Sequence, residues 1–528
     1  MTTSSSQKRK AEDFDDLLPE DCWEFVLSKL LKIDNIDHRN RYIRQTVSFV
    51  SKRFPYLTSL DFSRFRGDDL NSLLCRDSCS CSLSYLTSLN LSNHPTFPAL
   101  GLEKLVKKTQ LSLTSLTCSN LGSPLNHTDI TFIADSFPLL ELEDFDISFP
   151  KGRITSDDYD SCNNALKVLA QKLLKLRKVN LSDEVVMLEC PLLTHAGIAS
   201  AIYERPSLSS FSVGNFMEPR ESKNVTSYFI DSLVSLKHLT HLDLSLSCVT
   251  DDMLISVANE DLPLRNLVLQ DCCEYTYFGI SYFLSKCRFV QHLNLQNAKF
   301  LNDDDNSSML YPYLRDLVSI NVSGCNMLTN VTLFAFPRHC PLLSDIRMES
   351  TSIGIGPLGE PFVYRQVKSL HLANNSQLLN VNIDIFAFMF PNLQLLDLNS
   401  CPGISKDIGN VLRRWGDIRY LELPFYPQKE LPWINFKSSK LEFCPQLQQL
   451  DVENCRDITE DGVRLVVVNC KHLREINLQH CRKVSANIVD RMILLRPSLK
   501  IIAPPYPHAF LSLSDFEKGL LYVQDLVH

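Results

Sequence analysis

The stretch from Leu447 to Leu465 reads Leu447-Gln-Gln-Leu-Asp-Val-Glu-Asn-Cys455-Arg-Asp-Ile-Thr-Glu-Asp-Gly462-Val-Arg-Leu465. It contains the pattern L-x-x-L-x-L-x-x-C, followed by a polar turn and then by apolar residues at helical spacing. Almost the same pattern returns 26 residues later, from Leu473 to Cys481. This recurrence predicts an array of stacked structural repeats rather than several separate globular domains.

The second leucine-like position of the pattern, called the middle position here, recurs along most of the chain. It is occupied by Leu60, Leu89, Leu116, Phe145, Val179, Phe211, Leu242, Leu267, Leu293, Ile320, Ile346, Leu370, Leu396, Leu421, Leu450, Ile476 and, in a degenerate form, Ile502. The 442 residues from Leu60 to Ile502 span 16 intervals, about 28 residues each, which is a spacing typical of leucine-rich repeats.

Each pattern predicts a short strand with its leucine-like side chains pointing inward, because side chains alternate along a strand. Segments such as residues 461–469 predict helices on the opposite, convex side. We therefore expect an α/β solenoid, a leucine-rich-repeat horseshoe of about 16 to 17 repeats, over residues 57–503.

The composition limits the classes of partner and the compartment. A net charge of −8 argues against nucleic acid as the partner. No apolar run approaches the roughly 18 residues of a membrane-spanning helix, and the first ten residues lack the apolar segment of a signal peptide. We expect a nuclear and/or cytoplasmic protein that does not bind membranes.

Half of the 18 cysteines occupy two fixed places in the repeat, and in a reducing compartment we expect them to be thiols. Five occupy the slot five residues after the middle position, and four lie six residues before it. The pattern predicts that these nine are small, buried apolar side chains: Cys272, Cys325, Cys401, Cys455 and Cys481 in the slot, and Cys287, Cys340, Cys444 and Cys470 before the repeat.

Both ends of the chain differ from the repeats. Residues 1–16 predict a disordered tail, in which Lys8-Arg9-Lys10 is either solvated or a nuclear import signal. Residues 17–56 predict a small helical module, with one apolar face from Trp23 to Leu31 and another from Ile43 to Phe54. Residues 504–528 predict a C-terminal capping segment, with a capping-box signature at Ser514 and Glu517.

The order of the N-terminal residues is Leu18-Pro19-Glu20, an apolar helix, a polar connection and Val47-Ser-Phe-Val-Ser-Lys-Arg-Phe54. This order resembles an F-box, and an F-box before cysteine-containing leucine-rich repeats resembles the plant-type substrate receptors of Skp–cullin–F-box ubiquitin ligases. The resemblance implies a non-catalytic subunit that binds a Skp-type adaptor on a cullin scaffold and presents a target protein for ubiquitination. Carried over by position, the adaptor-binding residues are Leu18, Pro19, Val26, Leu27, Leu30, Val47, Val50 and Phe54.

Two alternatives remain open from the sequence. The N-terminal helices could serve only as a cap on the solenoid of a non-ligase interaction scaffold, because a solenoid end needs a cover. Some F-box proteins of this type are small-molecule hormone receptors that hold a polyanionic inositol phosphate, which requires a cluster of Lys and Arg.

Four segments lengthen the repeats and predict loops, which in repeat proteins often lie on the binding face. They are residues 150–159, 183–191, 216–223 and 424–434. The last contains Phe425, Tyr426 and Trp433 among prolines, so its aromatic side chains either contact a partner or fold back onto the solenoid.

The residue directly after each middle position should point outward from the concave face. With the flanking outward positions, these columns contain eleven acidic residues and only two bases, Lys178 and Arg347. This excess of acidic residues predicts a partner protein with basic or polar groups. The concave face also lacks the cluster of Lys and Arg that the hormone receptors require. The predicted substrate-facing residues are Asp243, Asn294, Asn321, Arg347, His371, Asp397, Glu422, Asp451 and Asn477.

No motif predicts a cofactor, a metal site or catalysis. The stretch Gly354-Ile-Gly356-Pro-Leu-Gly359 matches a dinucleotide fingerprint, but its prolines prevent the helix that a phosphate site needs, so it predicts a repeat loop. Cys75, Cys79 and Cys81 have only the distant His94 as a fourth zinc ligand. We therefore expect neither metal nor cofactor.

Overall fold

The computed structural model describes residues 58–63, 70–74, 85–109, 113–123, 125, 127–137, 144–146, 177–181, 198–199, 202–203, 205, 207–213, 227–303, 310–357, 362–404, 414–423, 445–453, 458–481, 483–485, 487–493 and 495–502. The chain forms two compact units. The first comprises Met1–Met327 and Arg338–Leu343, and the second comprises Leu328–Pro337 and Ser344–His528.

The first unit contains a parallel sheet in which each strand pairs with the next one in the chain. Its strands are β1 (Ser59–Asp61), β2 (Ser88–Asn90), β3 (Ser115–Thr117), β4 (Asp144–Asp146), β5 (Lys178–Leu181), β6 (Ser210–Val213), β7 (His241–Asp243), β8 (Asn266–Val268), β9 (His292–Asn294) and β10 (Ser319–Asn321). Its helices are α3 (Leu70–Leu74), α5 (Ala99–Thr109), α6 (His127–Ser136), α9 (Ser227–Val234), α10 (Asp251–Ala258), α11 (Tyr277–Lys286) and the short 3-10 helix η1 (Tyr311–Tyr313).

The second unit repeats this arrangement, again with each strand parallel to the next in the chain. Its strands are β11 (Asp345–Arg347), β12 (Ser369–His371), β13 (Leu395–Asp397), β14 (Tyr420–Glu422), β15 (Gln449–Asp451), β16 (Glu475–Asn477) and β17 (Lys500–Ile502). The helices here are α14 (Asn380–Met389), α16 (Glu460–Asn469) and α17 (Ile488–Ile493), and α13 (Asn330–His339) lies where the chain passes between the units. The predicted leucine-rich-repeat solenoid is confirmed.

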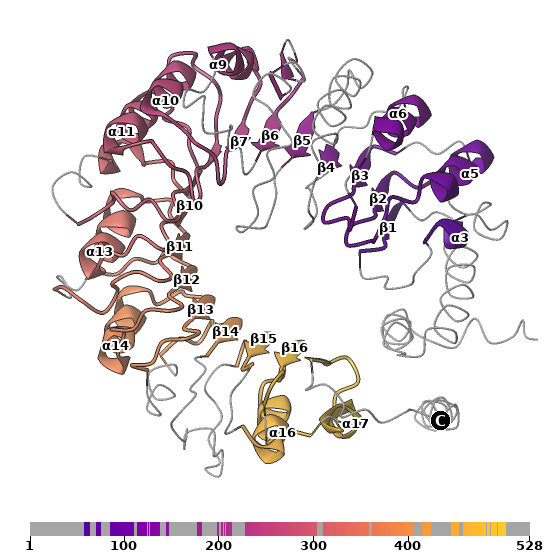
Figure 1. Ribbon diagram of the computed structural model, residues 1–528. Coiled ribbons are helices and arrows are strands. Elements are labelled where there is room, and N and C mark those ends of the chain that lie inside the picture. The colour runs from indigo at the N-terminus through magenta and orange to yellow at the C-terminus, as the bar shows by residue number, and fades with distance from the viewer. Residues whose placement is uncertain are drawn as a thin grey trace, which may run out of the picture. The chain divides into compact units, whose positions relative to one another are not determined.

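Most described middle positions are buried and form the core of each unit, as the pattern predicts, although Leu60 in β1 is half-buried. In the second unit all of them from Ile346 to Ile476 are at most 7% exposed, while the residues on either side in each strand point outward. Within each unit the helices lie on one side of the strands (Figure 1). Helix α16 illustrates how these helices begin, because the Thr459 side chain accepts a hydrogen bond from the backbone N–H of Gly462.

The last strand corrects one expectation. The residue aligned with Ile476 is Ile501, not Ile502. Ile501 is buried beside the buried Leu499, whereas Ile502 is half-buried. A shift of one residue exchanges the two faces of a strand, so Lys500 rather than Ile501 points outward.

The slot residues hold neighbouring repeats together through a hydrogen bond. The thiols of Cys272, Cys325, Cys401 and Cys481 donate to the backbone carbonyl two residues after the middle position of the preceding repeat, over 2.9 to 3.5 Å. Cys325, Cys401 and Cys481 are buried, as are Cys287, Cys340 and Cys470, but Cys272 is only half-buried. The expected purely apolar role is therefore incomplete, since the slot thiol is also a donor.

Two other residue types occupy the same slot. The Nδ2 atom of Asn375 donates to the carbonyl of Met348 over 2.8 Å, and the Nε2 atom of His94 lies 2.9 Å from the carbonyl oxygen of Phe62. His94, considered from sequence as a distant metal ligand, is 2% exposed. Burial lowers the pKa of His94, which favours the neutral ring.

Several expectations lie outside the described residues. These are the tail and the F-box-like module (1–56), the four predicted loops, the cysteines at 75, 79 and 81, and the capping segment after residue 503. The glycine-containing stretch is described up to Pro357 and forms turns, with Gly354 at a φ of +106°. Within the described part of the chain, no helix is long and apolar enough to cross a membrane.

Candidate protein-binding face

The last residue of each strand from β11 to β16 forms a row across the second unit, called the polar row here. Its members are register neighbours in the order Arg347, His371, Asp397, Glu422, Asp451 and Asn477. The predicted outward column is therefore present. The remaining predicted substrate-facing residues, Asp243, Asn294 and Asn321, end β7, β9 and β10 of the first unit.

Many Asp and Asn side chains at these positions have a structural role that the sequence interpretation missed. The Oδ1 atom of Asp397 accepts a hydrogen bond from the backbone N–H two residues later, over 2.8 Å. Asp243, Asn294, Asn321, Asp451 and Asn477 accept the equivalent bond. This Asx turn directs the chain away from the strand, and it explains much of the Asp and Asn content without a partner.

A second contact runs diagonally between repeats. The amide of Asn294 donates to Gln270, and that of Asn321 donates to Gln296, in each case to the residue three after the preceding middle position. The corresponding contacts in the second unit join His371 to Glu349 and Asn477 to Glu453. This diagonal contact thus joins two neutral side chains in the first unit, whereas in the second unit it includes a glutamate.

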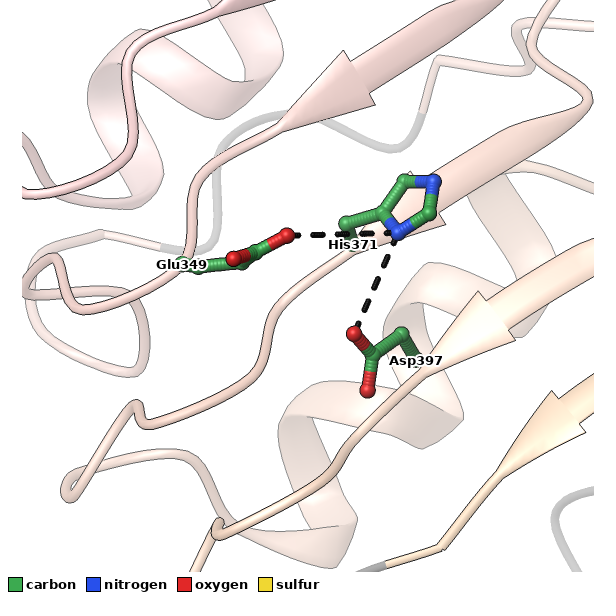
Figure 2. Close-up of side chains that lie close together, drawn as sticks. All are labelled: Glu349, His371 and Asp397. Atoms are coloured by element: carbon green, nitrogen blue, oxygen red, sulfur yellow. Dashed lines mark ion pairs between the residues drawn. The ribbon is translucent and has the colours of Figure 1, made fainter. Parts of the chain in front are cut away.

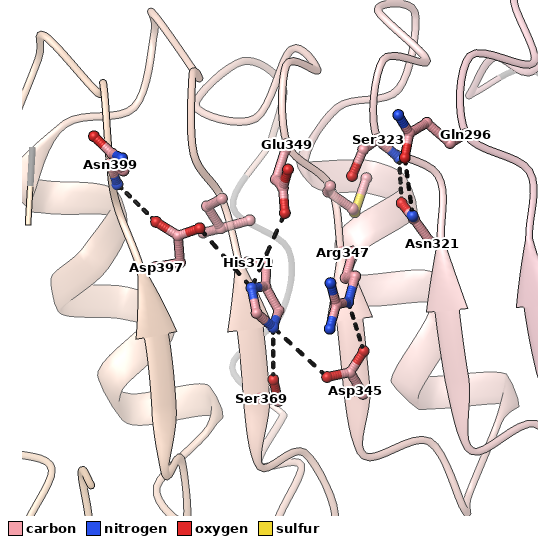
Figure 3. Close-up of polar contacts among 12 residues, drawn as sticks. Gln296, Asn321, Ser323, Asp345, Arg347, Glu349, Ser369, His371, Asp397 and Asn399 are labelled. Atoms are coloured by element: carbon pink, nitrogen blue, oxygen red, sulfur yellow. Dashed lines mark hydrogen bonds and ion pairs between the residues drawn. The ribbon is translucent and has the colours of Figure 1, made fainter. Parts of the chain in front are cut away.

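His371 is the centre of a cluster of carboxylates. Its Nδ1 atom lies 3.9 Å from Oδ2 of Asp397 and 4.0 Å from Oε1 of Glu349, and Figure 2 shows both carboxylates directed at this nitrogen. Its Nε2 atom lies 3.7 Å from Oδ2 of Asp345 and 3.1 Å from Oγ of Ser369 (Figure 3). The side chain is 12% exposed, so these charges interact in a partly desolvated place.

The charges of this cluster shift two pKa values in opposite directions. Burial lowers the pKa of His371, but the interactions with the carboxylates of Asp345 and Asp397 more than offset this and raise it to about 9. Burial raises the pKa of Asp345, whereas His371, Ser369 and Arg347 hold it well below the usual range of a carboxyl group. At neutral pH, His371 is therefore an imidazolium ion beside the ionised carboxylate of Asp345.

Glu422 differs from the other acidic members of the polar row. Burial and the neighbouring charges of Asp397 and Asp451 raise the pKa of Glu422 to about 7. Within the described residues no group donates a hydrogen bond to its carboxylate. Near neutral pH Glu422 is therefore divided between its protonated and ionised forms.

Glu349, His371 and Asp397 are also the described residues that could hold a metal ion. Their ligand atoms all lie within 4.8 Å of one another, and Asp345 lies on the other ring nitrogen, as second-shell carboxylates do. The proton on His371 opposes coordination, because a ligating imidazole must be neutral. A cation would have to displace that proton.

The second unit contains an outward base that the sequence interpretation did not include. Lys500 aligns with Glu475, and its Nζ atom lies 3.0 Å from Oε2 of that residue. Because Ile501 rather than Ile502 aligns with Ile476, Lys500 lies in the outward column. Even so, seven carboxylates face three basic side chains here: Asp345, Glu349, Asp397, Glu422, Asp451, Glu453 and Glu475 against Arg347, His371 and Lys500.

Comparisons with known proteins found similarities at low sequence identity. No protein-family model matches the chain. Lysine-specific demethylase 2A of Xenopus tropicalis is 25% identical over 190 residues, which cover 31% of this chain and 16% of that protein. The matched stretch thus spans about one sixth of the length of this curated relative.

Three solved structures resemble the chain at low sequence identity. A chain of the yeast Rad7 and Elc1 complex is 14% identical with a TM-score of 0.41, covering 91% of this chain and 97% of that chain. A chain of the TLR13–ssRNA13 complex is 18% identical with a TM-score of 0.44, covering 87% and 65%. A chain of the mouse RP105/MD-1 complex is 14% identical with a TM-score of 0.37, covering 87% and 93%.

Proposed function

We propose that the chain is the substrate-recognition subunit of a Skp–cullin–F-box ubiquitin ligase of the nucleus and/or cytoplasm. Its repeats bind a target protein through a Lys- and Arg-rich segment, and its N-terminal helices bind a Skp-type adaptor. The chain is not itself catalytic in this proposal. It raises the effective concentration of target lysines near the conjugating enzyme.

The charge of the polar row is the observation that supports binding of a basic target protein. Glu422 has a pKa of about 7 because burial and the charges of Asp397 and Asp451 oppose its ionisation. A cationic side chain placed beside these groups would relieve their repulsion and favour the ionised form of Glu422. The same charges disfavour anionic ligands, including the inositol phosphate of the hormone receptors.

The proposed binding of the adaptor is supported by the sequence. Leu18, Pro19 and Phe54 stand where the F-box resemblance places adaptor contacts, and all of them lie outside the described residues. The competing function is a scaffold whose N-terminal helices only cover the first repeat. The two functions differ in a single measurable property, which is adaptor binding.

The experiment is a pull-down of purified Skp-type adaptor by the full-length protein. The wild type should retain the adaptor, and the double variant Leu18→Ala/Pro19→Ala should lose at least about tenfold in affinity, because contacts at an interface centre dominate its energy. The matched control is Asp37→Ala/His38→Ala in the polar connection, which should bind like the wild type. A wild type that retains no adaptor would contradict the ligase function and favour the scaffold.

A further inference from the structure

A pair of cysteines in the first unit is unlike the other thiols in the described part of the chain. Cys248 and Cys273 each lie six residues after the middle position of their repeats, just beyond the ends of β7 and β8. Their Sγ atoms are 3.0 Å apart. Neither residue occupies the slot, although the thiol of Cys273 also lies 4.0 Å from the carbonyl oxygen of Ser247.

The backbone fixes these two residues as neighbours. Cys248 and Cys273 are partners in an isolated parallel β-bridge. The N–H of Cys273 donates to the carbonyl of Ser247 over 3.2 Å, and the N–H of Val249 donates to the carbonyl of Cys273 over 3.1 Å. Neighbouring parallel chains are about 5 Å apart, within the Cα separation that a disulfide spans, so the thiols can join without a rearrangement of the repeats.

Among the described cysteines, the solvent reaches this pair but not most of the other thiols. Cys273 is exposed and Cys248 is half-buried, whereas seven of the ten described cysteines are buried. The adjacent slot residue Cys272 is half-buried, but its thiol donates to the carbonyl of Leu244 over 2.9 Å. Burial and the neighbouring Cys273 raise the pKa of Cys248 to about 12, so the exposed Cys273 is the thiol that an oxidant meets first.

We propose that Cys248 and Cys273 form an oxidative modification site, at which a hydroperoxide converts the two thiols into a disulfide that joins neighbouring repeats. The Cys273 thiolate attacks a peroxide oxygen, the O–O bond breaks, and the thiolate becomes a sulfenic acid. The Cys248 sulfur then attacks the Cys273 sulfur and releases water. With hydrogen peroxide the balance is two thiols oxidised by two electrons, one peroxide reduced and two waters formed. Because the disulfide is exposed, a dithiol should reduce it again.

The test is differential alkylation of the folded, full-length protein after a low dose of hydrogen peroxide. Free thiols are blocked first, the protein is denatured and reduced, and newly released thiols receive a second label that mass spectrometry distinguishes. Cys248 and Cys273 should acquire the second label together and to the same extent, and a linked peptide pair should appear without reduction. Treatment with dithiothreitol before blocking should abolish both signals.

Two variants test whether the disulfide forms specifically between Cys248 and Cys273. Cys248→Ser should remove the linked peptide and leave Cys273 as a sulfenic acid that a dimedone probe captures, which requires no disulfide to be present. Cys272→Ser retains a donor for Leu244 and should form the Cys248–Cys273 link as the wild type does. Two results would overturn the proposal. One is a disulfide that includes Cys272. The other is a wild-type protein in which Cys248 remains a free thiol while Cys273 is oxidised to the sulfinic acid. Circular dichroism that matches the wild type confirms that each variant is folded.

Discussion

The Nδ1 atom of His371 lies 3.9 Å from Oδ2 of Asp397, its register neighbour on the next strand. The opposite ring nitrogen faces Asp345 on the preceding strand. One imidazolium ion thus lies between the carboxylates of the two neighbouring repeats, with Asp345 and Glu349 on the preceding side and Asp397 on the following side. The ion offsets a repulsion that would otherwise oppose the stacking of these repeats.

Replacement of His371 by Gln should lower the free energy of unfolding by about 1 to 3 kcal/mol at pH 6.5, because the carboxylates lose their cation. The folded pKa of about 9 lies above the ordinary 6.5, so this stabilisation is complete below pH 6.5 and is lost as pH rises through 9. Urea denaturation of both proteins at several pH values measures the difference, which should shrink above pH 9. His480→Gln, at an exposed histidine near Glu453, is the control, and an equal loss in both variants would contradict the special role of His371.

Glu422→Gln should stabilise the protein at pH 8 by about 1 kcal/mol after allowance for solvent screening. The folded pKa of about 7 exceeds the ordinary 4.5. The folded state therefore binds a proton that the unfolded state has released, and stability from this group falls as pH rises from 4.5 through 7. Thermal unfolding of the variant from pH 5 to 8 should show a flatter profile than the wild type. Asp384→Asn on α14, where Asp384 pairs with Arg414, should leave the wild-type slope unchanged.

A fluorescent Arg-rich peptide should bind the wild type with an affinity that rises as pH increases through 7, because Glu422 becomes ionised over this range. Asp451→Asn should weaken binding about threefold to tenfold, while the Asn side chain still accepts the Asx-turn bond from the N–H of Glu453. Asp384→Asn removes the same charge from a helix and should bind normally. Fluorescence anisotropy that shows no dependence on salt or on Asp451 would exclude an electrostatic site on the polar row.

Asn375→Ala should cost about 2 to 4 kcal/mol, because it leaves several buried polar groups without partners. The Asn375 side chain is fully buried, donates to the carbonyls of Met348 and Leu372, and accepts from the N–H of Thr351. Asn375→Cys should lose less, since a slot thiol still reaches the preceding repeat. Equal losses for the two variants, measured by urea denaturation, would show that the slot donor contributes little.

The leucine-like pattern predicted the fold because burial depends directly on it. Strand registers from Leu370 with Leu396 to Leu450 with Ile476 match the alignment of the sequence repeats. The exception is β17, where two successive isoleucines permit either register and the alternation of Leu499 with Ile501 decides it.

The candidate site was predicted only as a column of outward residues. The sequence placed His371 in that column but not at the centre of a cluster, because side-chain distances between repeats depend on stagger and rotamers that the pattern does not determine. A usable signal was present: Asp345, Glu349 and Asp397 all occupy outward positions in the repeats adjacent to His371. The Asx turns could have been anticipated from the recurrence of Asp and Asn directly after a strand.

The slot shared by cysteine, asparagine and histidine has a practical consequence for work on this protein. A thiol, a carboxamide and an imidazole all reach the same backbone carbonyl from equivalent places, so the repeat requires a donor rather than sulfur. Asparagine at Cys325, Cys401 and Cys481 should therefore preserve the contact between repeats, and it removes three of the 18 thiols that prevent the attachment of a single reporter dye.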